Sequence, residues 1–340
     1  MKIKKILLSL IAILCLVLVI TSCGGSDSSE ENNNEDVKET PSNPVVDLSN
    51  AFEFSLTPDG LGYIVTGYTG TYENIKVPDT YEGLPVVKIG DFAFQQNTVI
   101  KNVELPDSIT SFGEGAFRES SVEYINLPKG LTSISIDAFA VCKSLKKIDI
   151  HENITTIEAS AFHSCTELSE INISNGVKVI ESYAFAECSS LVNITLPNSV
   201  EEIGLGTFYL CSSLTSITIP EKVVVIEQST FSECSSLTSV DMGNAVRIVK
   251  YAFYNCLGLK NLVLGSKVSK IEQYAFNGCS GIESIVVPLS LKTVDKYAFE
   301  TAAFPVEIYY VGNAEQWAKI NIDFGNPCLT ESPITYNFHQ

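Results

Sequence analysis

Apolar residues recur along most of this chain in a pattern that repeats every 22 or 23 residues. In each period two aliphatic residues stand two positions apart, as Ile194 and Leu196 do. That spacing predicts a short β-strand with one buried face. A fixed period of this length indicates an array of repeated structural units. The same point of each period is marked by Phe94, Phe117, Phe139, Phe162, Phe185, Phe208, Phe231, Phe253, Phe276 and Phe299.

The other positions of the repeat predict how each unit folds and why a single unit would not be stable in isolation. The residue before each phenylalanine is alanine except at Thr207 and Thr230, so the site admits only a small side chain. A turn residue, most often proline, follows the strand, and a second apolar pair such as Val200 and Ile203 comes next. One coil cannot bury these aliphatic side chains, but stacked neighbours can. We therefore predict a repeat solenoid of about ten 22–23-residue coils with parallel β-ladders, capped at both ends.

Seven cysteines occupy one position of the repeat, three residues after the phenylalanine. A solenoid spreads such residues along the stack at about strand spacing, so their side chains run parallel and do not converge as metal ligands do. Parallel Cβ vectors also disfavour disulfides, although pairing of neighbours stays an alternative. We interpret the column as buried free thiols in a structural role, and Cys328 as either a surface thiol or a packed residue of the cap. The column consists of Cys142, Cys165, Cys188, Cys211, Cys234, Cys256 and Cys279.

The outward positions of the strands suggest where a partner binds, because a solenoid commonly presents its strand ladder to ligands. These positions are polar through the first and central repeats, for example Asn193 and Thr195. Towards the C-terminus they become Val263, Val286 and Tyr309, which we take as candidate partner-binding residues. The alternative, which the sequence favours, is that these residues merely suit strands and that the cap covers them.

The N-terminus has the pattern of an export signal. Residues 1–22 begin with Met-Lys-Ile-Lys-Lys and continue into an apolar run that is short for a membrane-spanning helix. Ile20-Thr21-Ser22-Cys23 resembles the lipobox of bacterial lipoproteins, which implies cleavage before Cys23 and lipidation of that residue. A retained transmembrane helix is the weaker alternative. Residues 23–50 are polar and acidic, which predicts a disordered tether.

Composition excludes several classes of function. The formal net charge of −18 disfavours binding to nucleic acid. The chain has three histidines, and no nucleophile and base are suggested by its pattern, so we expect no enzyme activity, no cofactor and no metal.

The repeat, L-x-x-I-x-L-P-x-x-[LV]-x-x-I-x-x-x-A-F-x-x-C, resembles the BspA-like or Treponema-type leucine-rich repeat over residues 91–305. Residues 61–90 resemble the opening segment of such arrays, and residues 306–326 resemble their common C-terminal cap. We therefore expect an N-terminal cap or atypical first repeat over residues 51–90 and a C-terminal cap over residues 306–340. The resemblance implies a non-catalytic bacterial surface protein that acts in adhesion or protein binding.

The expected role is therefore a lipid-anchored protein of the bacterial cell envelope, exposed at the surface, that binds a protein of a host or of another microbe. A structural scaffold or spacer of the envelope is the alternative. An accessory subunit for glycan or peptide uptake ranks last, because Trp317 is the only tryptophan and no aromatic platform is evident.

Overall fold

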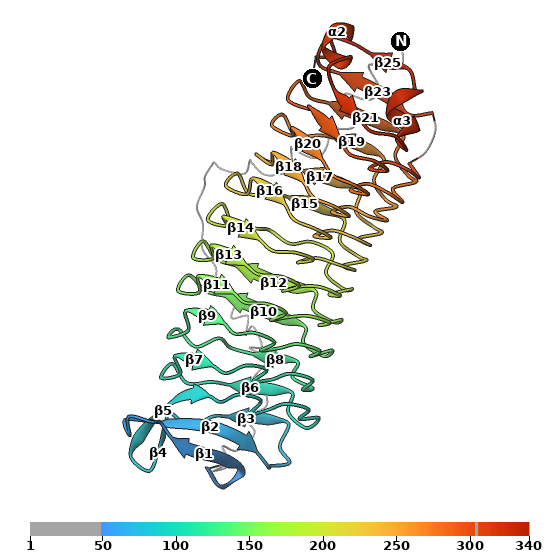
Figure 1. The fold of residues 1–340 in the computed structure, drawn as a ribbon. Helices are drawn as coiled ribbons and strands as arrows, with labels where there is room; N and C mark the ends of the chain where they lie inside the picture. The colour runs from blue at the N-terminus through green and yellow to red at the C-terminus, as the bar shows by residue number, and fades with distance from the viewer. Residues whose placement is uncertain (1–48, 303–304, 340) are drawn as a thin grey trace, which may run out of the picture. The chain divides into compact units, whose positions relative to one another are not determined.

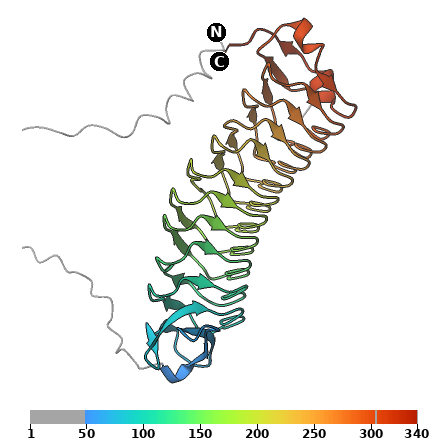
Figure 2. The same ribbon diagram turned by 60° about the vertical axis from the view of Figure 1, so that its left-hand side comes forward.

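The computed structural model describes residues 49–302 and 305–339 as coils that stack on one another in sequence order (Figure 1). The same order is visible after a turn of 60° (Figure 2). Two columns of short parallel strands follow the stack. The expected signal segment, Cys23 and nearly all of the expected tether lie outside the described residues. Among the described residues, no helix has the length and apolar character needed to cross a membrane.

The first column carries the strand predicted after each phenylalanine. Equivalent residues pair in register, as Lys147 does with Glu170. The coil between β12 and β15 pairs with β15 through a single bridge from Asn193 to Ser216. The strands are β3 (Asn74–Lys76), β6 (Asn102–Glu104), β8 (Tyr124–Ile125), β10 (Lys147–Ile150), β12 (Glu170–Ile173), β15 (Ser216–Thr218), β17 (Ser239–Asp241), β19 (Asn261–Val263), β21 (Ser284–Val287), β23 (Glu307–Tyr310) and β25 (Ile334–Thr335).

The second column carries the apolar pair that precedes each phenylalanine, with Ile157 opposite Ile180 as one example of its register. It has twelve strands within the described residues, so the ladders continue beyond the ten predicted coils into both flanks. The strands are β2 (Tyr63–Tyr68), β5 (Leu84–Ile89), β7 (Ser111–Phe112), β9 (Ser133–Ile134), β11 (Thr156–Ile157), β13 (Val179–Ile180), β14 (Glu202–Ile203), β16 (Val225–Ile226), β18 (Arg247–Ile248), β20 (Lys270–Ile271), β22 (Thr293–Val294) and β24 (Asn321–Ile322).

The repeated phenylalanines form one continuous stack through the core. All ten rings are fully buried. Neighbouring ring centroids lie 4.8 to 5.8 Å apart, and their planes differ by 2° to 13°. The small residue before each ring leaves room for this packing. Where it is Thr207 or Thr230, the buried hydroxyl donates to a carbonyl three residues earlier at 2.8 Å, which satisfies its hydrogen-bonding need.

The backbone around each phenylalanine makes hydrogen bonds that join one coil to the next. We call the segment from two residues before to two residues after the phenylalanine the corner. In a typical coil the N–H groups of Tyr183, Phe185 and Glu187 donate to carbonyls of the following coil at 2.7 to 3.0 Å. This geometry places the residues two before and two after the phenylalanine at positive φ, with φ 58° at Tyr183 and 61° at Glu187. A non-glycine residue in that region costs about 1–2 kcal/mol. Each added hydrogen bond returns about 0.5–1.5 kcal/mol, and the ring stack contributes further.

The two ends of the stack are closed in different ways. At the N-terminal end, a short 3-10 helix (Ser49–Ala51) precedes β1 (Phe52–Leu56), which pairs antiparallel with β2, while β4 (Thr80–Tyr81) pairs antiparallel with β5. At the C-terminal end, α2 (Ala314–Trp317) precedes β24, and α3 (Pro327–Thr330) precedes β25. The buried Asn326 side chain accepts a hydrogen bond from the Phe299 N–H at 2.9 Å. It replaces the carbonyl that a further coil would supply.

The positive φ required at the corner predicts that a valine there lowers the stability of the fold. Val141 has φ 62°, and Asn255 occupies the equivalent position of a later coil. Because asparagine tolerates this region far better than a β-branched residue, Val141→Asn should raise the free energy of unfolding by about 0.5–1 kcal/mol. Urea denaturation followed by circular dichroism measures this. Val192→Asn, at an exposed strand-side position, is the control and should not stabilise. A loss of stability in Val141→Asn would contradict the account.

Candidate binding face

The structure brings the three candidate partner-binding residues together on the outward side of the first column. Val263 on β19 stands opposite Val286 on β21, and Val286 stands opposite Tyr309 on β23. They form an uninterrupted row across three coils, which we call the apolar row. Val263 has 41% of its surface exposed, while Val286 and Tyr309 are half-buried. The row is therefore accessible, and most so at its Val263 end.

The C-terminal segment covers part of this row. The Phe338 ring packs against the Tyr309 ring with centroids 4.9 Å apart, and the Phe338 N–H donates to the Tyr310 carbonyl at 3.0 Å. The Tyr309 hydroxyl donates to the Glu307 carboxylate at 2.6 Å, and this hydrogen bond raises the pKa of Tyr309. Tyr309 is thus fixed in place by its neighbours, whereas Val263 lies on the side of the row away from this segment.

A shallow depression of about 500 Å³ adjoins the apolar row on the same face. Val263 belongs to both features. Two successive turns beside the depression have glycine in place of the usual proline, at Gly243 and Gly265. At Gly243, with φ 50°, an added Cβ would lie 2.3 Å from the Ile219 carbonyl oxygen, so the close approach requires glycine. The lining residues are Ser216, Ile217, Thr218, Ser239, Val240, Asp241, Met242, Val263 and Gly265.

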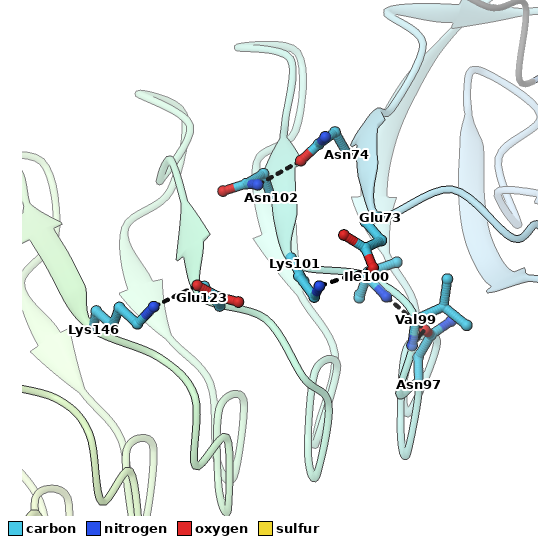
Figure 3. Close-up of polar contacts among 9 residues, drawn as sticks. All are labelled: Glu73, Asn74, Asn97, Val99, Ile100, Lys101, Asn102, Glu123 and Lys146. Carbon is cyan, nitrogen blue, oxygen red and sulfur yellow. Dashed lines mark hydrogen bonds and ion pairs between the residues drawn. The ribbon is translucent and has the colours of Figure 1, made fainter.

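The N-terminal end of the face has a different character, because its polar side chains contact one another (Figure 3). The Asn102 amide donates to the Asn74 side chain in the neighbouring coil. Lys101 pairs with Glu73 at 2.8 Å, and Lys146 pairs with Glu123 at 2.5 Å. These contacts satisfy the polar groups within the ladder itself.

Asn126 shows the same principle within the strand ladder. Its side chain accepts from the Leu105 N–H at 2.7 Å and donates to the Leu105 carbonyl at 2.8 Å. An amide side chain thus takes the place of a strand partner after β8 ends. The residue is part of the ladder and has little hydrogen-bonding capacity left for a ligand.

The seven cysteines of the column are buried and unbridged. Each thiol donates to the carbonyl of the phenylalanine in the preceding coil, at 2.9 to 3.3 Å. The thiol is therefore a donor that joins coils as well as a packing group. Burial raises the pKa of Cys142 and of Cys211 to about 12. Cys328, which the sequence left undecided, is also buried within the C-terminal cap.

An aromatic column on another side of the coils was missed by the sequence analysis. Tyr251, Tyr274 and Tyr297 each stand two residues before a phenylalanine, and their rings stack. The signal was present in the sequence as the triplet Tyr-Ala-Phe in three successive repeats. It could have been found by comparing every position of the repeat, including those outside the strands.

Parallel ladders, a stacked phenylalanine core and one outward strand face define a leucine-rich-repeat solenoid. The model described as "BspA type Leucine rich repeat region" matches with six copies over residues 68–191, 155–250 and 246–309. The chain belongs to this family, which confirms the resemblance inferred from the sequence. Solenoids of this family are generally non-catalytic and serve in protein binding or as scaffolds.

Solved structures of similar proteins come from several bacteria. A leucine-rich cell surface protein of Faecalibacterium prausnitzii is 22% identical, with 81% of this chain and 97% of that chain covered and a TM-score of 0.42. A leucine-rich-repeat protein of Treponema pallidum is 29% identical over 68% and 88%, with a TM-score of 0.44. The pneumococcal vaccine antigen PcpA is 19% identical over 85% and 98%, with a TM-score of 0.45. The search of curated proteins gave no match.

The buried thiols predict how stability depends on pH. A thiol whose pKa is about 12 in the folded state, and about 8.5 when unfolded, stabilises the fold fully below pH 8.5. That contribution is lost as the pH rises towards 12, by about 1.4 kcal/mol per pH unit for each thiol. The free energy of unfolding, measured by urea denaturation under reducing conditions from pH 7.5 to 10, should fall above pH 8.5.

Cys211→Ala is the comparison that assigns this effect to the thiols. Its slope above pH 8.5 should be smaller than that of the parent chain by one thiol's share. Identical slopes in the two proteins would show that other groups cause the loss of stability.

Proposed function

We propose that this chain is an exported lipoprotein, anchored through Cys23 and exposed on the bacterial surface, that binds another protein through the apolar row and the adjoining depression. The partner is a protein of a host's extracellular surroundings or of a neighbouring microbe's surface. Leucine-rich-repeat family membership supports the protein-binding part of this role. The anchor rests on the leader sequence and on its likeness to a lipobox.

The observation that carries the binding proposal is the position of Val263. It is 41% exposed, it lines the depression, and it begins the apolar row that continues through Val286 to Tyr309. Apolar contacts beside convergent hydroxyls and a carboxylate, here Thr218 and Asp241, resemble the centre and rim of a protein interface. The surface there combines a site for an apolar anchor with polar groups that orient a partner.

A scaffold or spacer of the envelope is the second candidate, and a specific observation favours it. Polar side chains of the face pair within the ladder, as Asn172 does with Asp149 and Ser284 does with Asn261 at 2.8 Å. Groups that satisfy one another contribute to stacking and have less to offer a ligand. Such pairs occur along much of the face, whereas Val263 and Val286 in the apolar row have no polar side chains to pair.

Substitution of the row separates the two functions. Val263→Asn with Val286→Asn places there the residue found at the equivalent Asn172, so the fold should be kept. Because two apolar contacts are lost, attachment of producing cells to extracellular-matrix extract or to a second bacterial species should weaken about tenfold or more. Half-maximal attachment in a titration of cells measures the effect.

The matched control changes two positions of the same face outside the row and the depression, Asn172→Thr with Thr195→Asn, and should attach normally. Attachment equal in both double variants would favour the scaffold. Circular dichroism of each purified variant verifies that the solenoid is intact.

The anchor has its own test. Cells supplied with a labelled lipid precursor should label the parent chain, because the Cys23 thiol is the proposed acceptor of the diacylglyceryl group. Cys23→Ala should lose the label and appear in the soluble fraction. Cys328→Ala should retain the label. Label that persists in Cys23→Ala would overturn the proposed anchor without affecting the binding proposal.

A further inference from the structure

Three tyrosines form an ordered column at the corner that follows the second strand of each coil. The centroids of Tyr251 and Tyr274 lie 5.1 Å apart and those of Tyr274 and Tyr297 lie 5.5 Å apart, with planes within 6° of parallel. All three have positive φ, as the equivalent residues of the other coils do, and the Tyr297 N–H donates to the Phe324 carbonyl at 3.2 Å. All three are half-buried, and part of each remains in contact with solvent.

A perpendicular ring stands at each end of this column. Tyr254 meets Tyr251 at 89° with centroids 5.6 Å apart, and Phe324 meets Tyr297 at 84° with centroids 5.0 Å apart. Phe324 is 66% exposed, although it is a large apolar residue. The result is a row of five aromatic rings that follows the stack of coils from β18 to β24.

Basic residues gather beside this row. Residues 246–324, which contain the whole row, have eight basic and seven acidic residues, whereas the whole chain has 22 basic and 40 acidic residues. Arg247 on β18 is in register with Lys270 on β20, and Lys270 with Thr293, the neighbour of Lys292. We call the following set the basic-aromatic strip: Arg247, Lys250, Tyr251, Tyr254, Lys270, Tyr274, Lys292, Lys296, Tyr297 and Phe324.

Acidic side chains neutralise only part of the strip. Glu272 pairs with Arg247 at 2.5 Å, and Asp295 lies 3.5 Å from Lys270. The Lys250 ammonium lies 4.9 Å from the centre of the Tyr251 ring. Within the residues that the structure describes, Lys250, Lys292 and Lys296 make no ion pair. Their charges are therefore available to an anionic ligand, on a protein whose net charge is otherwise strongly negative.

We propose that the basic-aromatic strip binds an acidic polysaccharide, one whose sugars carry carboxylate or sulfate groups. The lysines supply the charge for its anionic groups. The phenol hydroxyls and ring edges, repeated every coil, suit a polymer with hydroxyl groups and C–H surfaces repeated along its length. The exposed Phe324 ring gives the end of the row an apolar surface for one sugar.

The geometry of the rings favours this ligand over other polyanions. Single-stranded nucleic acid binds by stacking bases on free aromatic faces, but the tyrosine faces here are occupied by one another. An acidic peptide would use the lysines and leave the aromatic column without a role. The strip lies on the second-column side of the coils, so it does not depend on the apolar row of the first column.

The test measures binding of the full chain to four defined probes by biolayer interferometry: heparin, hyaluronate, neutral dextran and poly-glutamate, with single-stranded DNA as a fifth. The triple variant Lys250→Gln, Lys292→Gln and Lys296→Gln should bind the acidic glycans at least about tenfold more weakly, because it loses the charges of the half-buried Lys250 and of the exposed Lys292 and Lys296. Tyr274→Phe keeps the stack and removes one hydroxyl, and should weaken binding severalfold.

The control Lys129→Gln with Lys143→Gln removes charges far from the strip and should bind the glycans as the parent does. Binding of at least one acidic glycan, with these variant effects and little binding of dextran, supports the proposal. Absence of binding to both acidic glycans, or equal binding by the triple variant and the control, overturns it. Equal binding of poly-glutamate or DNA with the same sensitivity also overturns it, because the strip would then be a general polyanion site.

Discussion

The stacking of one phenylalanine on the next is the interaction on which the rest of this structure depends. Each ring fits because the preceding side chain is small, and its N–H donates to the following coil. Ring contact and backbone hydrogen bonds thus act at the same point of every repeat. The strands in the two columns are short, often only two residues long, and their pairing alone could not hold the coils together. The corner supplies the regular spacing that keeps both columns in register.

The same corner explains features that otherwise look unrelated. Residues such as Tyr183 and Val141 adopt positive φ because the alternate N–H groups must reach the next coil. Cysteine thiols donate back to the phenylalanine carbonyl of the preceding coil, so the coils that have the cysteine are joined in both directions. At the last coil, the Asn326 side chain accepts from Phe299 and ends the series. The cysteine column and this asparagine are parts of one hydrogen-bonding system.

Much of this architecture could be predicted from the sequence, because the spacing of apolar residues indicates which positions are buried and how often the unit repeats. The phenylalanine stack, the parallel ladders and the neighbouring positions of Val263 and Val286 were all predictable from spacing. The positive φ of Val141 was not predictable, because valine rarely adopts this conformation and because the hydrogen bond that requires it comes from the neighbouring coil. The cap role of Asn326 depends on a partner 27 residues away. The depression could not be predicted from the sequence, because it depends on how the side chains of several coils pack together.

A core that repeats so strictly leaves the surface free to vary column by column. The corner around each phenylalanine fixes the backbone position of every outward side chain. The identity of that side chain has little effect on the stack. A few substitutions at one position in consecutive repeats therefore create an extended surface, as with Tyr251, Tyr274 and Tyr297. Val263, Val286 and Tyr309 form another such surface on the first column. Surfaces built this way run parallel to the stack, so each is suited to a ligand that is itself extended or repetitive.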